Sequence, residues 1–169
     1  GASPTLLTNE GFAMTGVGPP GNGKVTSNTP AGGAVTVNAD RIAIDPVGTN
    51  ATLDLGTNGI TFQPRTAARP VDLGGADTAL TLGLTDAELD RVTAAGTITV
   101  GGTPAGPVTV SAPITPATNV SLSVVSGGNI VQSDGGTAPT TGTLTTAGTG
   151  TVTFTSSAGT VQPLPDGID

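Results

Sequence analysis

Short strings of alternating apolar and polar residues recur along most of the chain. In each string Val, Ile, Leu or Phe alternates with Thr, Ser or Asp, and Gly, Asn, Asp or Pro separates one string from the next. This period of two is typical of a strand that buries one face and exposes the other. The strings that each predict a strand are residues 34–37, 41–44, 51–55, 59–62, 96–100, 107–110, 120–124, 129–131, 142–145 and 150–154.

The rhythm of these strings divides the chain into three parts. Residues 1–33 are broken by Gly and Pro, and we expect an extended lead-in with at most one or two strands. Residues 34–162 carry the repeated strings, interrupted by a loop and helix insertion at about 63–95, and residues 163–169 form a tail. No apolar run approaches the ~18 residues that a membrane-spanning helix needs.

The spacing and the small side chains favour one all-β architecture over another. The strings start about 7–12 residues apart, which suits either a β-sandwich or a β-solenoid. Only 2% of the residues are aromatic, so a sandwich core would be poorly filled, whereas a narrow coil suits small aliphatic residues. We therefore expect a parallel β-helix whose outward Thr residues form ladders at ~4.8 Å, with an antiparallel β-sandwich as the alternative.

One segment, residues 84–92, follows a helical pattern instead. Thr85 and Glu88 have the spacing of a capping box, in which each side chain satisfies a free backbone amide. Leu84 precedes the cap and Leu89 follows it at the spacing of a hydrophobic staple. The pattern predicts a helix over 84–92, the only one of more than two turns, with a structural role.

Composition and charge exclude several classes of function. The chain has 169 residues and contains no His and no Cys, which removes the commonest general base, the thiol nucleophiles, disulfides and thiolate metal sites. Charged residues make up 10%, and the net charge of −7 disfavours nucleic acid as a partner. Residues 18–24 have the spacing of a phosphate loop, but Val25 stands where that motif needs Ser or Thr, so we expect no bound nucleotide.

Carboxylates are the remaining candidates for catalysis or for binding a cation. An acid pair suffices for glycoside hydrolysis, and the candidates are Asp40, Asp45, Asp54, Asp72 and Asp77. Asp54 alternates with apolar neighbours and is expected to point outward, while Asp40 and Asp45 should face opposite sides of one strand. We interpret these residues as turn formers and solubilising charges, and expect no enzyme activity.

Calcium is the one cofactor for which the sequence offers weak candidates. Asp77 and Asp134 are oxygen donors in Gly-rich turns, as hard cations prefer. However, these acids do not recur in phase as a calcium-binding repeat requires. We otherwise expect no cofactor and no metal.

A family resemblance is carried by several strings in the middle of the chain. They are PVDLGGAD at 70–77, LGLTDAELDRV at 82–92 and GTITVG at 96–101, flanked by LDLG at 53–56 and GITF at 59–62. These resemble segments of the filamentous-haemagglutinin-like, β-strand-repeat surface exoproteins of bacteria, over roughly residues 34–162. The resemblance implies a right-handed parallel β-helix, export across the cell envelope and a role in adhesion or surface structure. It implies no catalytic residues.

The sequence thus favours a non-enzymatic, extracellular filament segment of a bacterial surface, structural or adhesive. One alternative is an adhesin module that binds a glycan or matrix, and a third hypothesis is a polysaccharide-degrading β-helix enzyme. The expected partner is the protein itself, end to end or by strand addition, besides a surface glycan or matrix. Leu6 and Leu7 have no obvious partner in the sequence and are candidates for docking onto a neighbouring copy.

Overall fold

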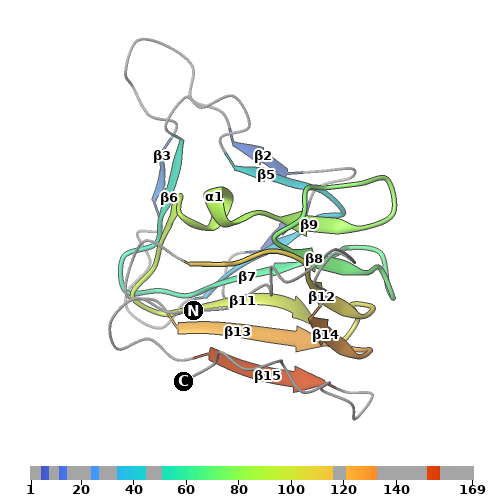
Figure 1. The fold of residues 1–169 in the computed structure, drawn as a ribbon. Helices are drawn as coiled ribbons and strands as arrows, with labels where there is room; N and C mark the ends of the chain where they lie inside the picture. Colours follow the sequence, from blue (N-terminus) through green and yellow to red (C-terminus); the bar gives the residue numbers. More distant parts are fainter. Residues whose placement is uncertain are drawn as a thin grey trace.

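The computed structural model describes residues 5–7, 12–14, 24–26, 34–44, 51–115, 121–132 and 152–156, with side chains at 34–44, 51–115 and 121–131. The described residues are mostly β-strand with one short helix (Figure 1). In order, the elements are β1 (Thr5–Leu7), β2 (Phe12–Met14), β3 (Lys24–Thr26), β4 (Val35–Asn38), β5 (Ile42–Ile44), β6 (Thr52–Asp54), β7 (Ile60–Gln63), β8 (Val71–Leu73), β9 (Leu82–Leu84), α1 (Asp86–Leu89), β10 (Val92–Thr93), β11 (Thr97–Gly102), β12 (Val108–Val110), β13 (Ser121–Ser126), β14 (Ile130–Gln132) and β15 (Val152–Ser156).

All pairings among the described strands are parallel. The expectation of an all-β fold is confirmed, and the antiparallel sandwich that stood as its alternative is wrong. Parallel neighbours cannot be joined by a tight hairpin, so the chain must leave each sheet and return to it. Consistent with this, the chain passes from β4 through β5 and β6 before β7 pairs with β4.

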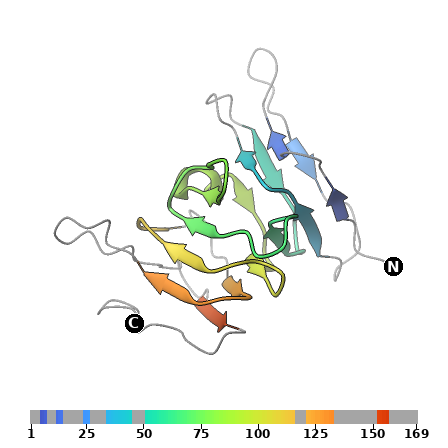
Figure 2. The same ribbon diagram turned by 90° about the vertical axis from the view of Figure 1, so that its right-hand side faces the viewer.

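The described strands form four sheets. The largest has six strands in the order β1-β4-β7-β11-β13-β15, stacked from one end of the molecule to the other in Figures 1 and 2. A four-stranded sheet has the order β14-β12-β8-β9 and a three-stranded sheet the order β10-β6-β3. The remaining pair is β2-β5, and β5 lies beside β9 without belonging to the same sheet.

Inward-pointing residues of the six-stranded sheet align into columns that form part of the core. Val37, Phe62, Val100 and Val124 are aligned in register, and each is completely buried. Burial of each such side chain contributes about 1.5–3 kcal/mol relative to exposure. Because successive strands align like residues, the described part of the core is filled by stacked aliphatic side chains and the ring of Phe62.

Outward-pointing residues of the same sheet form the expected hydroxyl ladder. At one register position, every strand carries Thr or Ser, and the described side chains there are partly exposed. Among the residues with described side chains, the column consists of Thr36, Thr61, Thr99 and Ser123. Thr5 and Thr153 occupy the same register position on the two flanking strands.

Two of the expected parts of the chain contain more described strands than the sequence predicted. The insertion expected at about 63–95 instead contributes strands to the sheets: β8 pairs with β12, and β10 pairs with β6. The apolar residues of β8 and β9 are fully buried, so the segment is part of the core. The lead-in 1–33 likewise carries three strands, and Leu6 is not without a partner, because β1 pairs with β4 and places it beside Val37.

The helix is shorter than expected. It spans only Asp86–Leu89, although the predicted capping box between Thr85 and Glu88 is present. Leu84 belongs to β9, and the chain after the helix enters β10, so strand pairing overrides local helical preference at both ends. Leu84 and Leu89 are both buried, as expected of a hydrophobic staple.

Two expectations concern residues that the structure does not describe. The predicted strand at 142–145 and the tail 163–169 lie outside the described residues. Within the ranges that are described, no helix is both long and apolar enough to cross a membrane.

Candidate functional site

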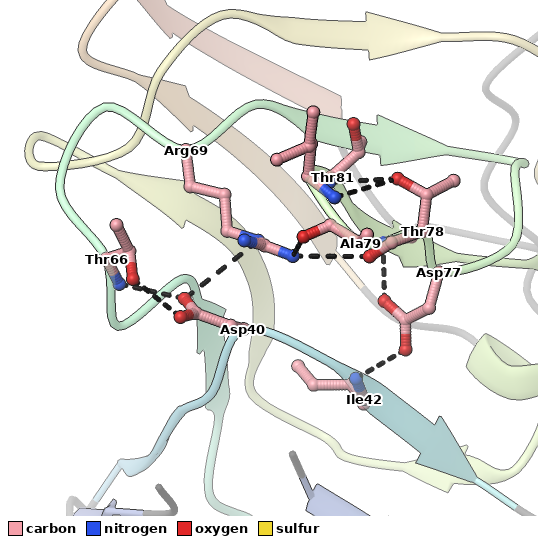
Figure 3. A network of polar contacts seen from close by, with 10 residues as sticks. Asp40, Ile42, Thr66, Arg69, Asp77, Thr78, Ala79 and Thr81 are labelled. Atoms are coloured by element: carbon pink, nitrogen blue, oxygen red, sulfur yellow. Dashed lines mark hydrogen bonds and ion pairs between the residues drawn. The ribbon is translucent and has the colours of Figure 1, made fainter. Parts of the chain in front are cut away.

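A set of carboxylates connects segments that are far apart in the sequence. We call Asp40, Asp77, Asp86 and Glu88 the carboxylate seam, because each accepts a hydrogen bond from the backbone N–H of a distant segment. Figure 3 shows the part of this seam around Asp40 and Asp77. The seam follows the turns and the helix that surround β5 and β9, where two sheets adjoin.

Asp77 joins β5 to β9 through a single side chain. Its Oδ2 accepts a hydrogen bond from the Ile42 N–H at 2.7 Å, and its Oδ1 accepts one from the Gly83 N–H at 2.8 Å. A backbone N–H that is kept from water needs an acceptor, and here the acceptor is a carboxylate instead of a strand carbonyl. The side chain of Asp77 therefore replaces strand pairing between β5 and β9.

Glu88 likewise accepts a hydrogen bond from β5, two residues beyond Ile42. Its Oε1 accepts a hydrogen bond from the Ile44 N–H at 3.2 Å. Its Oε2 accepts from the N–H of Thr85 at 2.9 Å and from the Thr85 hydroxyl at 2.8 Å, which closes the capping box. One carboxylate thus begins the helix and binds that helix to the neighbouring strand.

Arg69 lies at the centre of the polar network drawn in Figure 3. Its Nε is 3.9 Å from Oδ1 of Asp40, and its Nη2 donates to the carbonyl oxygens of Thr78 and Ala79 at 3.2 and 3.0 Å. Asp40 in turn accepts from the N–H and the hydroxyl of Thr66 at 2.8 and 2.6 Å. These contacts connect the segment at Asp40, the turn at Thr66 and the turn at residues 78–79.

The two resolved pKa shifts within the seam have opposite signs. Burial has the largest influence on the pKa of Asp77 and raises it; Glu88 adds to this, and the rise exceeds the lowering by the Gly83 and Ile42 amides and by Arg41. Burial also raises the pKa of Asp40, but there the hydrogen bonds from Thr66 and the charge of Arg69 outweigh it. The net pKa of Asp40 therefore lies below its usual value.

The lowered pKa of Asp40 predicts an acid-dependent loss of stability. A carboxyl whose pKa is depressed by folding stabilises the fold above its unfolded pKa of about 3.9, and this contribution is lost as the pH falls through the folded value. We expect Asp40→Asn to lose less stability than the unchanged chain on acidification from about pH 5 to about pH 2. The difference should stay below about 1 kcal/mol, because solvent screens a partly exposed pair.

Urea unfolding at several pH values measures this effect. Asp90→Asn removes an exposed carboxylate outside the seam and serves as the matched control. Identical pH profiles for Asp40→Asn and the unchanged chain would contradict the assignment of Asp40 as a stabilising charge.

The structure separates most of the carboxylates considered for catalysis. Asp54 lies on β6 between buried neighbours and is half-exposed, as predicted, and its Oδ1 accepts from the Gly56 N–H. Asp72 lies on β8, in another sheet. Asp40 and Asp77 belong to the seam, where their oxygens accept hydrogen bonds from backbone amides. Asp45, and with it the expectation that Asp40 and Asp45 face opposite sides, lies outside the described residues.

Of the two metal-binding candidates, the structure describes only Asp77. In the part of the chain that the structure describes, no group of three or more acidic residues is placed to hold a metal ion. Both carboxylate oxygens of Asp77 are engaged by backbone amides, and Asp134 lies outside the described residues. At the phosphate-loop-like segment, Lys24 begins strand β3, whereas the motif requires a helix.

Sequence reasoning missed two features of the seam. The bond from Glu88 to the Ile44 N–H joins residues 44 positions apart, and no local spacing announces it. Arg69 contacts the backbone of the turn after β8, which the sequence analysis placed in an insertion. The alternation in Val71-Asp72-Leu73 was the available signal for β8, and hence for the turn that Arg69 holds.

Comparison of the chain with protein-family models, with curated proteins and with solved structures finds no match.

Proposed function

We propose that this chain is a segment of a right-handed parallel β-solenoid that serves as a structural or adhesive filament on a bacterial surface, without enzyme activity. The observation that carries the proposal is the six-stranded parallel sheet, whose strands are contributed one after another along the chain. A chain that returns to the same sheet after visiting others winds around a common core. Stacking of such turns produces length and stiffness.

The side chains support a mechanical role. Core positions hold aliphatic residues and Phe62, and the outward column of the largest sheet is made of uncharged hydroxyl residues. The described carboxylates of the seam accept hydrogen bonds from backbone amides and thereby connect turns of the chain. These features support a scaffold, whereas a polysaccharide-degrading enzyme would need an acid pair facing a substrate cleft.

The proposal is tested by electron microscopy and by labelling of intact cells that produce the protein. We expect narrow filaments that antibodies against this segment label at the cell surface. Label that appears only after the cells are permeabilised would refute the surface location, and compact particles would refute the filament. The glycan-binding alternative instead predicts saturable binding that is lost when a single surface patch is changed.

A further inference from the structure

We propose that the junction between β5 and β9 is a proton-responsive latch, which holds the two strands more tightly when Asp77 carries a proton than when Asp77 is ionised. The latch consists of the Asp77 carboxyl group and the backbone N–H groups of Ile42 and Gly83. It is a conformational device of the fold, and it does not depend on the proposed filament.

A side chain replaces backbone pairing at this junction. Among the described strands, β5 pairs with β2 and β9 pairs with β8, but β5 and β9 do not pair with each other. Asp77 accepts hydrogen bonds from the Ile42 N–H of β5 at 2.7 Å (Figure 3) and from the Gly83 N–H of β9 at 2.8 Å. A change of charge on this one carboxyl group therefore acts on both strands at once.

A second carboxylate lies against the same edge of β5. Glu88 accepts a hydrogen bond from the Ile44 N–H, two residues beyond the Ile42 N–H that donates to Asp77. These two N–H groups point to the same side of the strand and lie roughly 7 Å apart, which is within the Debye length at physiological salt. Two ionised acceptors at such a separation repel each other, and a proton bound by Asp77 removes this repulsion.

Positive charge compensates the repulsion only in part. Arg41 attracts Asp77, but Arg41 is exposed, so water screens its attraction. Arg69 lies beside the same turn, where it donates to the backbone carbonyls of residues 78–79 and faces Asp40. Asp77 is therefore a partly buried carboxylate with a like charge beside it and a screened cation as its counter-charge.

Protonation removes the charge of Asp77 without removing its ability to accept hydrogen bonds. A neutral carboxyl group gains an O–H donor and retains acceptor capacity. The amides of Ile42 and Gly83 thus keep an acceptor after the proton is bound. The repulsion from Glu88 and the cost of keeping a charge away from water are both relieved.

The pKa of Asp77 agrees with this geometry, since it lies above its usual value. Burial is the largest cause and the charge of Glu88 adds to it, while the two backbone amides and Arg41 lower the pKa by less. A carboxyl group with a raised folded pKa stabilises the structure below its unfolded pKa, and this contribution is lost as the pH rises through the folded value. Acidification therefore tightens the latch, whereas it weakens the stabilisation that Asp40 provides.

Hydrogen exchange at the Ile42 amide tests the latch. We expect the protection of this amide, corrected for the intrinsic effect of pH on exchange, to rise about threefold or more between about pH 7 and about pH 4. The Val108 amide donates to the carbonyl oxygen of Asn129 and provides the control, whose protection should not rise. Asp77→Asn removes the titrating group and should abolish the rise at Ile42.

Protection at Ile42 that stays constant or falls on acidification would overturn the latch, as would an equal rise in Asp77→Asn. NMR titration of the Asp77 carboxyl group in the unchanged chain provides a second measurement that does not depend on how a variant folds. A pKa above the usual value of about 3.9 supports the latch, and a pKa at or below it overturns the latch. Glu88→Gln removes the neighbouring charge and should move this pKa toward the usual value.

Discussion

Replacing Phe62 by Ala is expected to lower the free energy of unfolding by about 3–5 kcal/mol. Phe62 is completely buried, and its neighbours in register on both sides, Val37 and Val100, are buried valines. Parallel strands bonded on both sides cannot move inward to fill the space, so the cavity persists. Because small domains are stable by only about 5–15 kcal/mol, this single change should remove a large share of the total.

Urea unfolding followed by circular dichroism measures the loss. Leu80→Ala is the control, because Leu80 is 76% exposed and its truncation should change stability by less than about 0.5 kcal/mol. A loss below about 1 kcal/mol for Phe62→Ala would mean that the strands can collapse around the missing ring.

Replacing Glu88 by Ala should cost about 2–4 kcal/mol, clearly more than replacing its capping partner Thr85 by Ala, which should cost about 1 kcal/mol. Both changes break the capping box. Only the change at Glu88 also leaves the Ile44 N–H without its acceptor. The difference between the two variants therefore measures the bond from helix to strand.

Hydrogen exchange at the Ile44 amide separates the two roles of Glu88. We expect Glu88→Ala to lower protection of this amide at least tenfold, whereas Thr85→Ala leaves it nearly unchanged. Asp90→Ala removes an exposed acid at the end of the same helix and provides the matched control. Equal stability losses for Glu88→Ala and Thr85→Ala would show that the contact with Ile44 contributes nothing.

The strands could be predicted because their signal is local. Along β4 and β7, buried and half-buried positions alternate as the apolar and polar residues do in the sequence. The hydroxyl ladder follows from the same alternation once strands are stacked in parallel. The capping box was also predictable, since Thr85 and Glu88 are three residues apart.

The remaining features depend on contacts that span many residues. The helix ends at Leu89 because the following residues form β10, which pairs with the distant strand β6. Asp77 was interpreted as a turn former or calcium ligand, but its partner Ile42 is 35 positions away. Neither fact has a local pattern, so the carboxylate seam could not be derived from composition or spacing.

The replacement of strand pairing by side chains between β5 and β9 also has a mechanical consequence. Pulled along the direction in which its strands stack, the six-stranded sheet carries load through continuous backbone hydrogen bonds. On the side of β5, the same load passes through the single carboxylates of Asp77 and Glu88, whose torsions rotate far more easily than a paired strand extends. Under tension, this side is therefore expected to yield before the six-stranded sheet does.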